Sequence, residues 1–95
     1  ENLLNCNTAS IAYETVNIDN ELPMLKPMSE IEGRLEILDC IPLLKKNNQG
    51  KGKLRSGTSL ADPANVIILG AGIVGVNALE MSLGLGANTT ILDIK

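Results

Sequence analysis

The sequence predicts an α/β fold, and its last third predicts a parallel sheet made of a strand, a helix and a second strand. A continuous β-branched and aliphatic run over residues 66–69 is typical of a parallel strand that is buried on both faces. Residues 73 to about 84 repeat apolar side chains at helical spacing, with glycines at the end. Residues 89–93 form a second extended run. These three segments follow one another closely, as in a strand–helix–strand unit.

The composition limits the chemistry open to this chain. Hydrophobic residues make up 44% of the 95 positions, which is typical of a packed globular protein. The sequence contains no histidine, so an imidazole acid, base or metal ligand is excluded. Cys6 and Cys40 match no zinc or redox spacing, so we expect reduced thiols, no metal site and a cytoplasmic location. The apolar runs are too short to cross a bilayer, and we expect no membrane contact.

The charge distribution argues against nucleic acid as a partner. The net charge is −3, and residues 1–50 carry eight acidic against four basic side chains. A basic cluster does occur, but no aromatic side chain is interleaved for base stacking. We expect its members to face water, and we expect residues 47–62 to form a polar loop that contains glycine. The cluster consists of Lys45, Lys46, Lys51, Lys53 and Arg55.

The first half of the chain predicts a strand, a hinge and a helix. Residues 11–18 favour a strand. Two prolines predict an extended connector over residues 22–28, which we interpret as a hinge between domains. Ser29 is followed by glutamate three positions on, a capping pattern that predicts a helix over about residues 30–40. Pro42 predicts a kink or the end of that helix.

The turn between the strand and the helix of the last third carries a Gly-x-Gly-x-x-Gly pattern over residues 70–75. In this context the first glycine permits a tight turn and the second lets the backbone approach a pyrophosphate. The third lets the helix pack closely on the sheet. The N–H groups at the helix start would then face the phosphates. The pattern predicts the start of a Rossmann-type, doubly wound parallel sheet.

An acidic residue completes the pattern. Asp93 lies eighteen positions after Gly75, close to the roughly 20 expected for the carboxylate that binds the ribose 2′-hydroxyl of NAD. A carboxylate there favours NAD over NADP, while FAD remains an alternative. A turn that merely joins the strand to the helix would explain neither the third glycine nor this aspartate. The expected cofactor contacts are Gly70, Ala71, Gly72, Ile73, Val74, Gly75 and Asp93.

Longer elements of the sequence resemble the L-alanine dehydrogenase family over about residues 10–95. Its Tyr-Glu-Thr and Pro-Met-Ser-Glu elements are more specific than the glycine pattern. The elements that carry the resemblance are Ala12-Tyr-Glu-Thr-Val16, Leu22-Pro-Met-Leu-Lys-Pro-Met-Ser-Glu30, Gly33-Arg34, Val66 to Gly75 and Leu83-Gly-Leu-Gly-Ala87. Two departures from the family pattern are Pro42 and the stretch over residues 51–56.

The resemblance implies a domain organisation and further site residues. Residues 1–26 would end the first segment of a substrate domain, and residues 27–95 would form a hinge helix and the first half of an NAD-binding domain. Ser29 would contact NAD, with helix capping alone as the alternative. Leu25 and Met28 would form apolar walls near the substrate and nicotinamide, with hinge packing as the alternative.

The resemblance also implies an activity. The parent protein would convert L-alanine and NAD to pyruvate, ammonium and NADH as a cytoplasmic homo-oligomer, expected to be a hexamer. The family's catalytic lysine and histidine are expected upstream of Glu1, so this stretch is expected to be an inactive internal fragment. A transhydrogenase α subunit and a non-catalytic module that senses NAD are the alternative functions.

Overall fold

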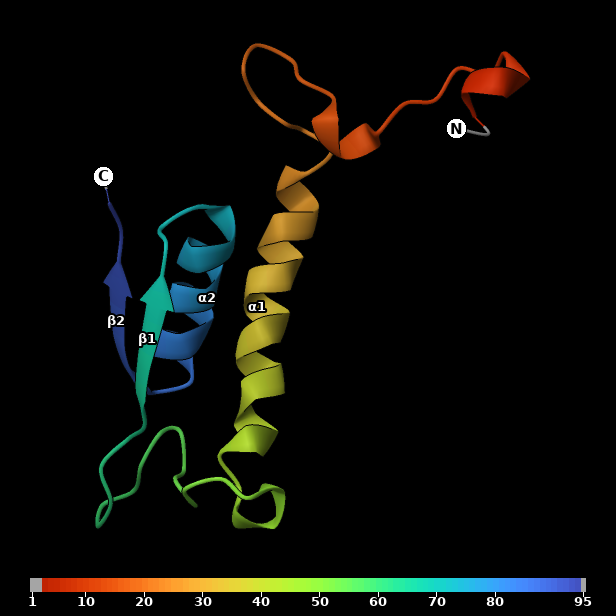
Figure 1. Cartoon of the computed structure of the whole chain (residues 1–95). Coiled ribbons are helices and arrows are strands. Elements are labelled where there is room, and N and C mark those ends of the chain that lie inside the picture. Colours follow the sequence, from red (N-terminus) through yellow and green to blue (C-terminus); the bar gives the residue numbers. More distant parts are fainter. Residues whose placement is uncertain (1–2, 95) are drawn as a thin grey trace.

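The computed structural model describes residues 3–94 and shows an α/β chain (Figure 1). The longest element is helix α1 (Lys26–Leu43), which is followed by strand β1 (Asn65–Leu69), helix α2 (Ile73–Gly84) and strand β2 (Asn88–Leu92). Three short 3-10 helices, η1 (Leu4–Cys6), η2 (Tyr13–Thr15) and η3 (Lys46–Asn48), lie in the segments that precede and follow α1.

The two strands form the parallel sheet that the sequence predicts. β1 and β2 pair in register from Asn65 opposite Asn88 to Leu69 opposite Leu92, and α2 connects them. α2 has the predicted bounds, whereas β1 begins one residue earlier than predicted. β2 ends at Leu92, so Asp93 lies directly after the strand rather than within it. The strand–helix–strand prediction is confirmed.

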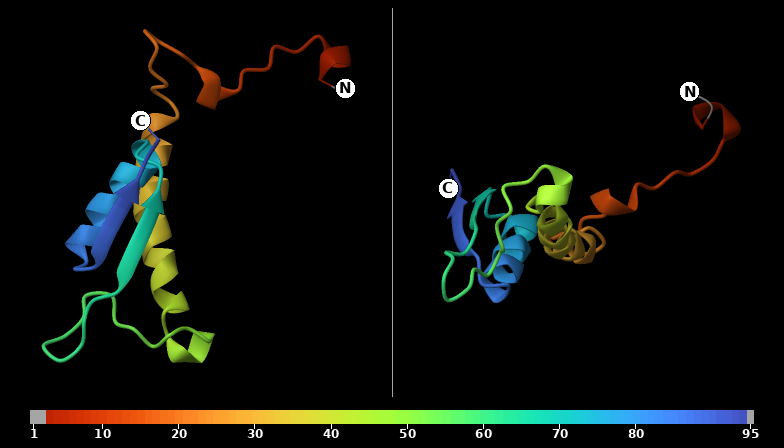
Figure 2. Two further views of the ribbon diagram at one scale, coloured as in Figure 1. Left: turned by 60° about the vertical axis from the view of Figure 1, so that its left-hand side comes forward. Right: turned by 90° about the horizontal axis from the view of Figure 1, so that it is seen from below.

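The elements stack in three layers, with α2 between the sheet and α1 (Figure 2). α2 covers one face of the sheet, where the side chains of Val66 and Ile68 are half-buried. On the other face Ile67 and Leu69 are 67% and 81% exposed. Among the described residues nothing packs on this second face, so the expected burial of the strand is found on one face only.

α1 and α2 approach each other closely at Gly33. A Cβ atom on Gly33 would lie 2.2 Å from the carbonyl oxygen of Val74 and 3.1 Å from the backbone nitrogen of Ala78. Arg34 extends this contact, because its Nε donates to Asn77 Oδ1 at 3.1 Å. A glycine without a side chain is what allows α1 to lie directly against the first half of α2.

The strand predicted over residues 11–18 is wrong. The chain forms the 3-10 helix η2 there, in which the backbone N–H and the hydroxyl of Thr15 both donate to the carbonyl oxygen of Ala12, at 3.0 and 2.8 Å. A threonine hydroxyl that binds a nearby carbonyl offers the backbone an alternative to a sheet. Within the described chain only an isolated bridge between Ile18 and Glu21 pairs part of this segment.

The expected start of α1 is also wrong, because the helix begins at Lys26 and not near residue 30. Residues 22–25 form a turn, in which Leu25 and Lys26 both donate their N–H to Leu22, so the predicted extended connector is absent. Pro27 lies in the first turn of the helix, where a missing N–H costs nothing.

Ser29 therefore lies inside α1, and its own N–H donates to the carbonyl oxygen of Leu25 at 3.0 Å. The predicted capping role of Ser29 is wrong, because the cap position is Leu25 and carries no side-chain capping bond. At the other end, α1 includes Pro42 and stops one residue later at Leu43, so of the predicted kink or end the structure shows an end close to the proline.

One member of the basic cluster is buried, contrary to the expectation that all five face water. Arg55 is only 6% exposed, and its Nη1 donates to the carbonyl oxygen of Ile37 in α1 at 2.7 Å. Its Nη2 donates to Ser82 Oγ in α2 at 3.3 Å, and the Ser82 hydroxyl lies 2.7 Å from that of Thr89 in β2. Burial lowers the pKa of the Arg55 guanidinium. Arg55 thus links the second half of α1 to the last turn of α2, and the Ser82 hydroxyl continues the contact to β2.

Candidate functional site

The glycine turn lies at the carboxyl end of the sheet, between the end of β1 and the start of α2 (Figure 1). In parallel α/β sheets this edge is where ligands bind. The N–H of Gly70 donates to the carbonyl oxygen of Leu92 at 2.7 Å, which continues the ladder between β1 and β2 by one bond. The turn is thereby placed directly beside the end of β2.

Each glycine of the turn meets a different requirement. Gly70 has φ of +104°, a conformation that side chains rarely adopt. At Gly75 a Cβ atom would collide with the carbonyl oxygen of Gly70 and lie 3.5 Å from Ile68 Cγ2, so this glycine lets α2 pack against the turn and the strand. Gly72 has an ordinary φ of −72°, and a Cβ atom there would meet nothing within 4 Å. The space beside Gly72 is open, as a ligand in contact with the backbone requires.

The start of α2 presents backbone donors to that space. The first helical bond runs from Val76 N–H to the carbonyl oxygen of Gly72 at 2.9 Å. The N–H groups of the first helical turn have no partner within the helix. Gly72 occupies the cap position and supplies no side-chain capping bond. Such an end attracts an anion, because the donors and the positive end of the helix dipole point the same way.

Asp93 lies next to the turn. Its Oδ2 accepts a hydrogen bond of 2.5 Å from the N–H of Ala71. The structure thus brings all seven of the turn and strand-end residues predicted from the sequence into one group. It also shows a contact that the sequence did not predict, namely that the carboxylate expected to bind ribose holds a backbone donor of the turn.

The three hinge residues lie in different places. Leu25 lines a cleft of about 340 Å³ together with Ile73, the first residue of α2, which brings it close to the turn. Met28 lines a separate hollow along α1 with Ile31 and Leu35. Ser29 is half-buried in the first turns of α1. Leu25 therefore lies close to the turn, whereas Met28 lies in a different hollow, along α1.

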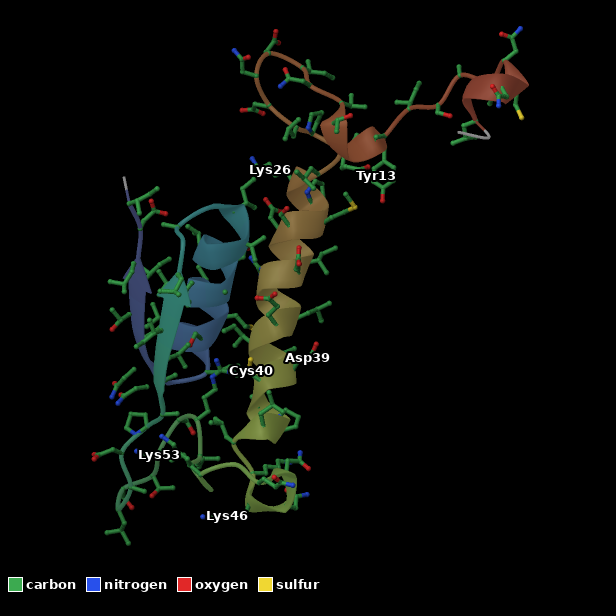
Figure 3. The ribbon with its side chains drawn as sticks, viewed as in Figure 1. Tyr13, Lys26, Asp39, Cys40, Lys46 and Lys53 are labelled. Carbon is green, nitrogen blue, oxygen red and sulfur yellow. The ribbon has the colours of Figure 1, made fainter. Side chains whose placement is uncertain are left out.

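Lys26 lines the same cleft as Leu25 and Ile73, and the sequence reasoning did not select it. Its side chain extends from the first turn of α1 on the side of α2 (Figure 3). The signal that could have found it is a lone lysine between the two prolines of the hinge.

The described residues hold neither a metal-binding cluster nor a helix suited to span a membrane. Within residues 3–94 no cluster of three or more acidic, cysteine or histidine side chains could hold a metal ion. In the same part of the chain, neither α1 nor α2 combines the length and the apolar character that a membrane span needs.

The fold and the turn define a class, namely α/β chains in which a strand, a glycine turn, a helix and a second, parallel strand follow one another. Comparison with known proteins then identifies the family. The model of the alanine dehydrogenase/PNT C-terminal domain matches residues 37–95. The chain belongs to the alanine dehydrogenase/PNT family.

Similar proteins agree with this assignment. The chain is 48% identical over 94 residues to an alanine dehydrogenase of Methanococcus maripaludis and 45% identical over 94 residues to one of Mycobacterium tuberculosis. It covers 25% of each relative, and each match covers 98% of this chain. A solved structure named L-alanine dehydrogenase superposes with a TM-score of 0.91 at 42% identity, over 98% of this chain and 26% of that one. The chain thus spans about a quarter of the relatives it matches.

Proposed function

We propose that this chain supplies the NAD-binding turn of an NAD-dependent L-alanine dehydrogenase. The observation that carries the proposal is the group formed by the glycine turn, the start of α2 and Asp93 at the carboxyl edge of a parallel sheet. The open space beside Gly72 and the uncapped helix start fit a pyrophosphate. The names of the relatives support L-alanine as the substrate.

The residues of this chain would position the cofactor and leave the chemistry to groups elsewhere in the protein. The N–H groups of Ile73 and Val74, in the first turn of α2, would hold the pyrophosphate. Asp93 would hold the adenosine ribose and favour NAD over NADP. From the hinge, Ser29 would contact NAD, and Leu25 and Met28 would form apolar walls near the substrate and nicotinamide.

When bound, NAD would accept the hydride that leaves the Cα of L-alanine. Loss of this hydride with a proton converts the amine to an imine, which water hydrolyses to pyruvate and ammonium. Placing the two reacting carbons in contact removes much of the entropic part of the barrier. The contribution of this chain would be that placement.

The domain organisation and assembly form part of the same proposal. Residues 1–26 would close the first segment of the substrate domain, and residues 27–95 would open a Rossmann-type NAD domain. The exposed apolar face of β1 supports a doubly wound sheet, because Ile67 and Leu69 would be covered by helices from the rest of the protein. We place the whole enzyme in the cytoplasm as a homo-oligomer, a hexamer by family resemblance.

The test is an assay of the full-length protein that contains this chain. We expect NADH to form from NAD only when L-alanine is supplied. Binding of NAD without any L-alanine-dependent reduction would overturn the dehydrogenase proposal and favour a module that senses NAD. Hydride transfer between two nicotinamide nucleotides, without L-alanine, would instead favour a transhydrogenase subunit.

A further inference from the structure

Asp93 contacts the glycine turn, and this contact gives the residue a task besides ribose binding. Two successive N–H groups of the turn donate to the end of β2. Gly70 N–H binds the backbone carbonyl of Leu92 at 2.7 Å, and Ala71 N–H binds the carboxylate of Asp93 at 2.5 Å. Ala71 and Asp93 are far apart in the sequence, so this bond links the first crossover to the end of the second strand.

The turn has few side chains of its own to hold it in place. Gly70 and Gly72 flank Ala71, and a Cβ atom at either glycine would meet nothing within 4 Å. Gly70 also has a positive φ, a conformation that a flexible backbone leaves easily. A hydrogen bond to a carboxylate is stronger than one between neutral groups, so the bond from Asp93 is well suited to fix this segment.

We propose that Asp93 is a positioning residue that fixes the glycine turn through the N–H of Ala71, so that the shape of the pyrophosphate cradle depends on this carboxylate. This proposal rests on the proposed function, because it assumes that the turn binds a dinucleotide. It assigns the N–H of Ala71 to Asp93, and it leaves the phosphates to the N–H groups further along, at the start of α2.

A consequence follows for nucleotides that carry a 2′-phosphate. Such a ligand repels the carboxylate and must displace it to bind. Displacement would break the bond to Ala71 and release the turn that holds the pyrophosphate. NADP would therefore be disfavoured twice, by charge and by the loss of an ordered cradle.

The test uses a ligand without the ribose hydroxyl groups that Asp93 would bind, so that only the effect of Asp93 on the turn is measured. The probe is an NAD analogue whose adenosine ribose lacks both the 2′- and 3′-hydroxyl groups, so a side chain at position 93 has no ribose hydroxyl to bind. Asp93→Asn and Asp93→Ala are compared in the full-length protein. Both variants are neutral at this position, but only asparagine keeps an oxygen that can accept from Ala71 N–H.

We expect Asp93→Ala to bind this analogue about tenfold more weakly than Asp93→Asn does, the change typical of losing one hydrogen bond that orders a ligand site. Equal affinity of the two variants for the analogue would overturn the positioning role and leave Asp93 as a ribose ligand only.

Hydrogen exchange in the nucleotide-free protein gives a second reading. The Ala71 amide should exchange slowly in the wild type and in Asp93→Asn, and faster in Asp93→Ala. An unchanged exchange rate in Asp93→Ala would contradict the proposal. If the wild-type protein bound no NAD, the proposed function would fail, and the exchange rates would still decide whether Asp93 fixes the turn.

Discussion

At the scale of single residues, the spacing of the sequence predicts which residues form the site but not which of them bind one another. The positions of Gly70, Gly72, Gly75 and Asp93 followed from the pattern, because each meets a local backbone or charge requirement. The bond between Asp93 and Ala71 did not follow, because it depends on how β2 lies beside the turn. A spacing rule says where a carboxylate is, whereas only the paired strands show which donor it meets.

Replacing Asp93 by alanine should change nucleotide preference. We expect Asp93→Ala in the full-length protein to lower the affinity for NAD more than that for NADP, because the variant loses a ribose acceptor and also loses the charge that repels a 2′-phosphate. The ratio of the two dissociation constants, measured by calorimetry, tests this. A ratio equal to that of the wild type would remove Asp93 from the ribose.

At the scale of elements, the regular part of the fold was predictable and the first half was not. α2, β1 and β2 have strong periodic or continuous apolar patterns, and their bounds differ by at most one residue from those predicted. The strand over residues 11–18 failed because β-favouring side chains cannot form a strand without a partner. α1 begins before the capping pattern at Ser29 because Pro27 is itself a favourable residue in the first turn of a helix.

Buried Arg55 shows a second limit of sequence reasoning. A basic residue in a polar stretch usually faces water. Here the loop passes beside α1 and α2, where the Ile37 carbonyl and the Ser82 hydroxyl accept hydrogen bonds from Arg55. Neither acceptor is near Arg55 in the sequence. No local pattern could have distinguished this arginine from its exposed neighbours.

Arg55 should therefore matter for stability in a way that its neighbours do not. Arg55→Met is expected to lower the free energy of unfolding of the full-length protein by about 1–3 kcal/mol, because it removes the buried bonds to the Ile37 carbonyl and the Ser82 hydroxyl. Lys53→Met, at an exposed position of the same loop, is the matched control and should change it by less than about 0.5 kcal/mol. Equal effects in denaturant titrations would mean that the buried bonds add nothing.

The contact between α1 and α2 gives a second prediction at this scale. Gly33→Ala places a methyl group 2.2 Å from the carbonyl oxygen of Val74, so the helices must separate, at a cost of about 1–3 kcal/mol. Gly84→Ala is the control, because a Cβ atom there meets nothing within 4 Å and alanine favours a helix by up to about 1 kcal/mol. Thermal unfolding of the two variants should shift in opposite directions, and a stabilising Gly33→Ala would contradict the packing described.

At the scale of the whole molecule, the chain is elongated, with extents of 64 × 32 × 21 Å. The segment before α1 extends away from the sheet (Figure 1), and near its end residues 20–22 and Leu25 share a cleft with Ile73 at the start of α2. The outer face of the sheet exposes Ile67, Leu69 and Leu92. Both features fit a chain that covers about a quarter of its relatives.

The open face predicts how the chain behaves by itself. Expressed as residues 1–95, it should self-associate, because a two-stranded sheet with an exposed apolar face is marginally stable in water. A double variant with Ile67→Lys and Leu69→Lys should associate less. Size-exclusion chromatography distinguishes these outcomes, and a monomeric, cooperatively folding wild-type chain would show that this face needs no cover.

The central claim is that the turn beside Gly72 holds a dinucleotide, and one comparison tests it directly. NAD affinity is measured by calorimetry for Gly72→Ala and Gly84→Ala in the full-length protein. Both substitutions add a methyl group where nothing lies within 4 Å, so both variants should fold, but only the first fills the space proposed for the pyrophosphate. We predict at least about a tenfold loss of NAD affinity for Gly72→Ala and wild-type affinity for Gly84→Ala. Wild-type affinity in both variants would show that NAD does not bind against this turn.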